Sequence, residues 1–272
     1  MDRIEVGVAG LSLIDLVVVL GVVVVLPLAI GGRWWRWGLA GLGVAVALTQ
    51  DRGSGAAVLV LPWVGVAVER IVHVVRRAGP LMFWTRADVV QGLAGLYALV
   101  AAGALVQSRL GVRLFGVREP IVELTAVHYV YAGCAALVLA GAVARGSRLA
   151  GAAVLCTALA PPIVAFGFVT RSAVPQVGGA ALMTLGVWLT AGLELREVLA
   201  APAPAGARAL LAVSGLAVWV PMVLAVAWAA GQHWDVPYLS ISDMARLHGL
   251  PNALAFTVAG LTARRLQGKV ST

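Results

Sequence analysis

Residues 4–30 read IEVGVAGLSLIDLVVVLGVVVVLPLAI, and this stretch decides the fold class. A helix needs about 20 apolar residues to cross the hydrocarbon core of a bilayer, and this run exceeds that length. It is too long for the apolar core of a signal peptide and has no convincing small-residue cleavage site. We therefore predict that it remains in the mature protein as a membrane span.

The rest of the chain continues this pattern. Of its 272 residues, 61% are hydrophobic and 12% are charged, whereas a soluble domain has about 25% charged residues. The apolar runs are long and do not alternate, which favours helices over a membrane β-barrel. The predicted fold is all-α, a polytopic transmembrane helical bundle of about eight to nine spans in a single domain, residues 1–272. The predicted spans are 4–30, 37–50 (the shortest), 55–75, 88–107, 121–143, 149–169, 176–199, 207–230 and 243–262.

The basic residues indicate how the chain is oriented. Twenty Lys and Arg exceed twelve Asp and Glu, and nearly all flank apolar runs, which favours contacts with anionic lipid headgroups over nucleic acid. In a nine-span arrangement, thirteen basic residues fall on one side and seven on the other. This predicts a bacterial inner membrane protein with its N-terminus outside and its C-terminus in the cytoplasm. The segment RLGVRLFGVREP (109–120) is an exception, since it places Arg109, Arg113 and Arg118 outside.

Two spans carry an acid followed five positions later by a histidine. The fifth reads EPIVELTAVHYVYAG (119–133), with Glu123 and His128, and the ninth reads SDMARLHGLPNALAF (242–256), with Asp243, His248 and Asn252. An ionisable group within hydrocarbon costs about 2.5–3.5 kcal/mol, so such groups point to a functional site. In the nine-span arrangement both sets occupy the outer half of the bilayer.

Other residues join this predicted polar pocket. Asp15 is expected about midway along the first span, and Trp63 follows Pro62 in the third. Aromatic faces that could bind a cationic intermediate come from Trp63, Tyr129, Tyr131 and Phe256. The simpler alternative is that these polar groups only form hydrogen bonds between helices. Further charged groups are expected at the membrane interface: Glu69, His73, Asp88, Glu194 and Glu197.

No metal or cofactor is predicted. Cys134 and Cys156 fall within spans and lack metal-type spacing, so we expect neither a disulfide nor a zinc site. The chain has no nucleotide loop, no zinc-binding helix and no Asp-rich motif for a metal-bound diphosphate. The expected partners are a lipophilic prenylated small molecule and membrane lipids, with no nucleic acid and no obligate protein partner.

Three segments carry a family resemblance. RLFGVREPIVELTAVHYVYAG (113–133) resembles the hallmark of YndJ-like bacterial membrane proteins, MARLHGLPNALAF (244–256) is similar to another conserved run of that family, and VLPW (60–63) is similar to its Pro-Trp element. Val130 departs from the pattern, because the family has a second His there, and this puts a two-His function in doubt. Actinobacterial relatives resemble membrane-bound cyclases of drimentine-type indole sesquiterpenoid pathways, and the Ala-, Val-, Gly- and Arg-rich composition suits such a source.

This resemblance leads to two hypotheses for the function. The first is a cofactor-free terpene cyclase that protonates a terminal alkene or an epoxide of a prenylated, indole-type sesquiterpenoid substrate. Burial in an apolar site keeps a carboxylic acid in its protonated form, and Glu123, Asp243 or Asp15 could supply that acid. His128, His248 and Asn252 would orient the acid and accept a proton. The second hypothesis is a YndJ-type transporter of a small or proton-coupled solute, in which the same groups relay protons.

Overall fold

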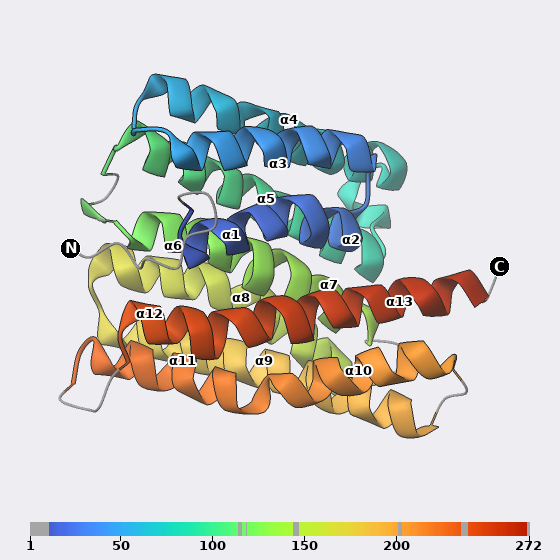
Figure 1. The fold of residues 1–272 in the computed structure, drawn as a ribbon. Helices are drawn as coiled ribbons and strands as arrows, with labels where there is room; N and C mark the ends of the chain where they lie inside the picture. Colours follow the sequence, from blue (N-terminus) through green and yellow to red (C-terminus); the bar gives the residue numbers. More distant parts are fainter. Residues whose placement is uncertain are drawn as a thin grey trace. The chain divides into compact units, whose positions relative to one another are not determined.

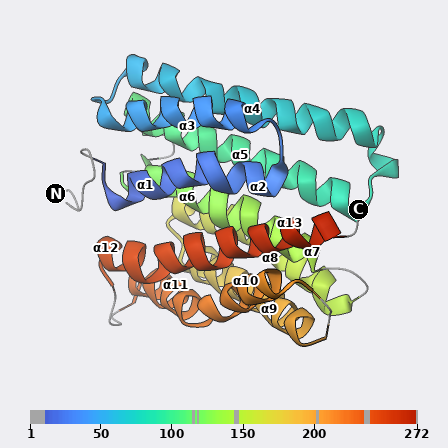
Figure 2. The same ribbon diagram turned by 45° about the vertical axis from the view of Figure 1, so that its right-hand side comes forward.

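The structure is a computed structural model that describes residues 11–113, 116–117, 119–143, 147–200, 203–234 and 239–270. The described residues form helices and no strands (Figure 1, Figure 2). This confirms the predicted all-α helical bundle. The contacts divide the chain into two compact units, Met1–Cys134 and Ala135–Thr272, and each is described here by itself. The single domain stays a prediction.

Seven helical segments within the described ranges are long and apolar enough to cross a membrane. They are Leu13–Ile30, Ser54–Ala78, Arg86–Leu110, Ile121–Ala142, Arg148–Thr170, Ala173–Ala200 and Ala205–Gly231. Two further predicted spans are helical but do not meet both criteria: α3 (Trp34–Thr49) has 16 residues, and the last helical segment runs from Ile241 to Val270. The chain is therefore a polytopic membrane protein.

The first unit is held together by close helix contacts at small residues. Its elements are α1 (Leu13–Leu20), η1 (Gly21–Val25), α2 (Leu26–Ile30), α3 (Trp34–Thr49), α4 (Ser54–Ala78), η2 (Leu81–Phe83), α5 (Arg86–Leu110), α6 (Ile121–His128) and η4 (Tyr129–Ala135). Helices α3 and α4 run side by side in both views (Figure 1, Figure 2). A Cβ atom on Gly43 of α3 would lie 2.3 Å from the Leu59 carbonyl oxygen of α4, so only glycine fits there. Helices in lipid associate largely through such close packing.

The second unit uses the same principle. Its elements are α7 (Ala136–Ala142), α8 (Arg148–Thr170), α9 (Ala173–Ala200), α10 (Ala205–Ala217), α11 (Trp219–Gly231), α12 (Ile241–Met244), η5 (Ala245–Gly249), η6 (Pro251–Val258) and α13 (Ala259–Val270). Helices α8 and α9 form a hairpin in which a Cβ atom on Gly186 would lie 2.6 Å from Thr157 Oγ1. Backbones can approach this closely because the glycine has no side chain.

Four stretches of the described chain are π-helical: η1, η4, η5 and η6. They interrupt the first, fifth and ninth predicted spans, which are the spans that carry the predicted acids and histidines. A π-helical turn widens the helix and changes the direction of its side chains, and such turns are frequent at functional sites. The π-helical stretches therefore lie in the same three spans in which the sequence predicted functional residues.

Candidate functional site

Asp15 lies in the first turn of α1, not midway along its span as the sequence predicted. Asp15 Oδ2 accepts the Ser12 backbone N–H at 2.7 Å, and Ser12 Oγ accepts the Asp15 N–H at 3.2 Å. This capping box pairs backbone donors that a helix end otherwise leaves unsatisfied. The predicted depth was wrong because the cap at Ser12 starts the helix there, although apolar residues also precede it.

Glu123 lies in the first turn of α6 and forms an ion pair with α5. Its Oε2 is 3.4 Å from Arg109 Nη2, and the exposed fractions of the two side chains are 12% and 7% respectively. Arg109 Nη2 also donates to Ser108 Oγ at 3.1 Å. The sequence had assigned Arg109 to an outer loop, whereas the structure places it in the last turn of α5. Because both groups are buried, losing either one would leave an uncompensated charge.

Asp15 and Glu123 form what we call the acid pair. Their carboxyl groups are neighbours, where α1 packs against α6. An ionised carboxylate only accepts hydrogen bonds, so a hydrogen bond between two carboxyl groups requires a proton on one of them. If the two groups share a proton, the acid pair carries one negative charge, which the Arg109 guanidinium balances. In that state the three side chains form a neutral cluster with one acidic proton.

A second layer of polar groups surrounds this cluster. Glu119 Oε2 accepts the Glu123 backbone N–H at 3.2 Å, and its Oε1 is 3.5 Å from Arg52 Nη2. The Arg109 carbonyl oxygen accepts the Gly53 N–H at 2.7 Å, which ties the loop before α4 to the end of α5. Arg118, which the sequence grouped with Arg109, lies outside the described residues. These contacts hold the helix ends that carry the acid pair and Arg109.

His128 lies at the last residue of α6 and is exposed. Its Nδ1 is 2.8 Å from the Leu124 carbonyl oxygen. A carbonyl only accepts, so Nδ1 carries the hydrogen, and in a neutral imidazole Nε2 is then the acceptor. Residues five positions apart on a helix are separated by about 7.5 Å along its axis. A proton donor at Glu123 and a proton acceptor at His128 are therefore offset along one helix.

The predicted aromatic residues of the first unit lie in helix contacts. Tyr131 is buried and donates its hydroxyl to the Val17 carbonyl oxygen at 2.8 Å, which links η4 to α1. Tyr129 meets Tyr97 edge to face, with ring centroids 5.4 Å apart. Trp63 is fully buried, and its Nε1 has no hydrogen-bond partner among the described residues. Tyr129 and Tyr131 thus hold the helices of the site in place.

The ninth predicted span lies in the second unit. Asp243 caps α12, where its Oδ2 accepts the Ser240 hydroxyl at 2.6 Å. His248 in η5 has its Nδ1 2.8 Å from the Pro221 carbonyl oxygen of α11. Asn252 Nδ2 donates to the His248 carbonyl oxygen at 2.7 Å, and the Phe256 side chain is buried. Because the two units are described separately, a common site for both sets of residues stays a prediction.

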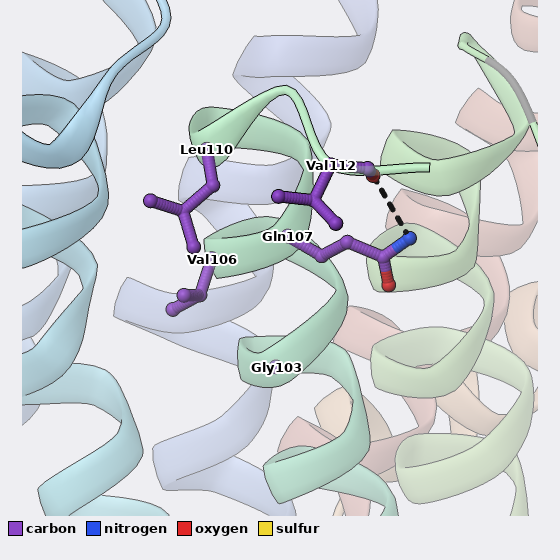
Figure 3. Close-up of a pocket in the computed structure, with 5 residues that line it drawn as sticks. All are labelled: Gly103, Val106, Gln107, Leu110 and Val112. Carbon is purple, nitrogen blue, oxygen red and sulfur yellow. Dashed lines mark hydrogen bonds between the residues drawn. The ribbon is translucent and has the colours of Figure 1, made fainter. Parts of the chain in front are cut away.

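An open apolar groove lies at the end of α5 (Figure 3). It has a volume of about 390 Å³ and is lined by Gly103, Val106, Gln107, Leu110 and Val112. Gln107 Nε2 turns back to donate to the Val112 carbonyl oxygen at 3.2 Å, which leaves an apolar surface (Figure 3). None of the predicted site residues lines this groove. The groove lies at the C-terminal end of α5, which also carries Arg109.

A family model described as YndJ-like protein matches residues 16–256 of this chain. The chain belongs to the YndJ-like family. The match includes Glu123 and His128 as well as the ninth-span residues from Asp243 to Phe256, while Asp15 lies one residue before it. No curated protein and no solved structure matches this YndJ-like chain. Within the described residues, no group of three or more His, Cys, Asp and Glu side chains is placed to hold a metal ion.

Sequence reasoning missed two charged residues of this YndJ-like chain that lie inside the helix bundle. Arg109 was counted only as an orientation signal, and Glu194 was expected at the membrane interface although it is fully buried. The partners of both lie on other helices, so no pattern within one helix shows the pairing. The cap that positions Asp15 did have a signal: Ser12 and Asp15 have the Ser-x-x-Asp spacing of a capping box before an apolar run.

Proposed function

We propose that this YndJ-like chain is a membrane-embedded terpenoid cyclase that starts its reaction by protonation. The observation that carries the proposal is the arrangement of the acid pair beside the buried Arg109 guanidinium, where the ends of three helices meet. In this proposal the acid pair shares one acidic proton, so that the cluster is neutral. An apolar substrate dissolved in the bilayer can approach such a cluster more readily than a bare charge, because the charges are already paired.

The reaction balances without a cofactor. The protonated carboxyl group of the acid pair donates its proton to a terminal alkene or an epoxide of a prenylated substrate, and a carbocation forms. Ring closure makes carbon–carbon bonds from the remaining double bonds, and the last cation loses a proton to a base. The product from an alkene is therefore an isomer of the substrate. His128 Nε2 is the proposed base, because Nδ1 donates to Leu124.

The substrate class follows from this chemistry together with the family resemblance. We propose a prenylated, indole-type sesquiterpenoid in a bacterial inner membrane, with the N-terminus of the chain outside and its C-terminus in the cytoplasm. Trp63, Tyr129, Tyr131 and Phe256 are the proposed aromatic contacts, and Asp243, His248 and Asn252 are proposed to complete the site. Arg109 is a positioning residue, because it acts through Glu123.

The test is to incubate purified protein with a farnesylated indole in detergent and to search for an isomeric cyclic product by mass spectrometry. Asp15→Asn and Glu123→Gln each remove the hydrogen-bonded proton and should abolish the product. Asp88→Asn is the matched control, because Asp88 forms the same kind of capping box, with Thr85 at the start of α5. No product from the wild type with several prenylated substrates would argue against a cyclase.

A transporter is the second candidate, and the π-helical stretches favour it. Interrupted helices bind solutes and coupling ions in many transporters, and η1, η4, η5 and η6 interrupt three of the helical segments. In this case the acid pair would exchange protons with water as a solute crosses. Proton flux into liposomes that Glu123→Gln abolishes, without any cyclic product, would support the transporter and exclude the cyclase.

A further inference from the structure

A second buried ionic cluster lies in the second unit. Its centre is Glu194 on α9, whose side chain has an exposed fraction of 0%. Ser214 on α10 places its Oγ 2.8 Å from Glu194 Oε2, and Arg264 on α13 places its Nη2 3.5 Å from Glu194 Oε1. Three helices therefore meet at one carboxyl group that the predicted chemistry does not use.

Arg264 is bound mainly to a different acid. It donates through Nη1 to Glu197 Oε2 and makes a longer contact of 3.3 Å with Gln267 Oε1. Its Nη2 and Nε have no hydrogen-bond partner among the described residues, and neither does Glu194 Oε1. The cluster contains two carboxyl groups and one guanidinium, so it carries an excess negative charge if both acids are ionised. A buried excess charge is costly in the membrane.

The hydroxyl of Ser214 indicates how this excess is removed. Its Oγ lies 2.8 Å from Glu194 Oε2 and 3.0 Å from the Phe256 carbonyl oxygen. A hydroxyl has one hydrogen, so it cannot donate fully to both oxygens. If Glu194 carries a proton, its O–H donates to Ser214 Oγ, and the Ser214 hydroxyl donates to Phe256. Every polar atom of this chain of hydrogen bonds then has a partner of the correct kind.

The packing around Ser214 favours a proton over a larger ion. A Cβ atom on Gly260 would lie 2.7 Å from Ser214 Oγ and 3.1 Å from a methyl group of Leu139. The charged groups near Glu194 are Glu197 on its own helix and Arg264 on α13, while α10 contributes Ser214 and η6 contributes the Phe256 carbonyl. We propose that Glu194 is a proton-binding site, and that Arg264 and Glu197 connect it to the membrane surface.

Proton release would change which acid Arg264 binds. When Glu194 is protonated, Arg264 pairs with Glu197, as in this structure. When Glu194 loses its proton, the unpartnered Arg264 Nη2 and Glu194 Oε1 can close their 3.5 Å separation, so that the guanidinium bridges both acids. The released proton passes to water near Glu197, whose side chain is one-third exposed. The site thus links proton binding to the packing of α9 against α13.

Dicyclohexylcarbodiimide tests this proposal, because this apolar reagent modifies protonated carboxyl groups within membranes. Full-length protein in detergent is treated between about pH 5 and about pH 9, and labelled peptides are quantified by mass spectrometry. We expect labelling at Glu194 that decreases as the pH rises. In Glu197→Gln the guanidinium is free to pair with Glu194, so labelling should fall by about tenfold or more at a given pH. Glu69→Gln, which removes a carboxyl paired with Arg36 elsewhere, is the matched control and should not change labelling of Glu194.

Infrared spectroscopy provides an independent reading. Glu194→Gln resembles the protonated acid in shape and charge, so it should fold and lose one carboxylic-acid carbonyl band relative to the wild type. Labelling of Glu194 that is independent of pH and unchanged in Glu197→Gln would overturn the proposal. The proposal would also be overturned if Glu194→Gln removed no carboxylic-acid carbonyl band from the infrared spectrum. Neither result depends on whether the acid pair of the first unit catalyses a cyclisation.

Discussion

Replacing Arg109 with leucine should destabilise the protein in a strongly pH-dependent way. Arg109 is the positive partner of the acid pair, and its side chain is only 7% exposed. Without it, the acid pair keeps one negative charge in a buried position. Removing one partner of a buried ion pair typically costs about 3–5 kcal/mol.

Proton uptake by the acid pair limits the stability lost in Arg109→Leu. The variant can neutralise the acid pair by binding a second proton, which for an ordinary glutamic acid costs about 4 kcal/mol at pH 7 and about 1 kcal/mol at pH 5. The loss of stability for Arg109→Leu should therefore not exceed about 4 kcal/mol at pH 7 and about 1 kcal/mol at pH 5. The sign follows from linkage: the folded variant binds more protons than the unfolded chain, so its stability falls as pH rises.

The assay is unfolding by SDS titration in mixed micelles, followed by tryptophan fluorescence at both pH values. The double variant Arg109→Leu/Glu123→Leu is the control, because it removes the unpaired charge together with its partner. It should recover most of the stability at pH 7. A loss that is equal at both pH values, or a double variant no more stable than Arg109→Leu, would refute the charge balance assigned to the cluster.

Three further predictions concern single side chains. Gly43→Ala should destabilise the protein by about 1–3 kcal/mol, because the added methyl group overpacks against the Leu59 carbonyl. Gly38→Ala on the same helix is the control: its methyl group has no atom within 4 Å, so the variant should be neutral or stabilising in the same SDS titration. Tyr131→Phe should cost only about 0.6–1 kcal/mol, since Val17 O keeps its contact with the Gly21 N–H; a loss above about 2 kcal/mol would contradict this. His128→Phe should change stability by less than about 0.5 kcal/mol and lower turnover at least about 100-fold, and unchanged turnover would remove His128 from the proposed mechanism.

Much of the fold could be predicted from the sequence because hydrocarbon imposes simple rules on a chain. A run of about 20 apolar residues must form a helix, so the spans at 55–75 and 88–107 correspond closely to α4 and α5. The run at 37–50, predicted as the shortest span, is the 16-residue helix α3, which is too short to be among the seven candidate spans.

The candidate site was predicted less completely, because its decisive contacts join different helices. Glu123 was singled out, but its partners Arg109 and Asp15 were assigned respectively to a loop and to the middle of a span. Both errors concern where a helix ends, and apolar patterns locate ends poorly when apolar residues continue past the cap. Glu194 shows the same limit, since its burial depends on Ser214 and Arg264 and not on its neighbours in α9.

Deuterium incorporation shows whether the reaction begins with protonation of carbon. The proposed cyclase transfers a proton from the acid pair to carbon, and in heavy water that proton is a deuteron. Wild-type protein should convert a farnesylated indole in heavy water into a cyclic product with a single deuterium at the protonated carbon, and Glu123→Gln should yield none. A cyclic product without deuterium, or equal product from Glu123→Gln, would contradict it.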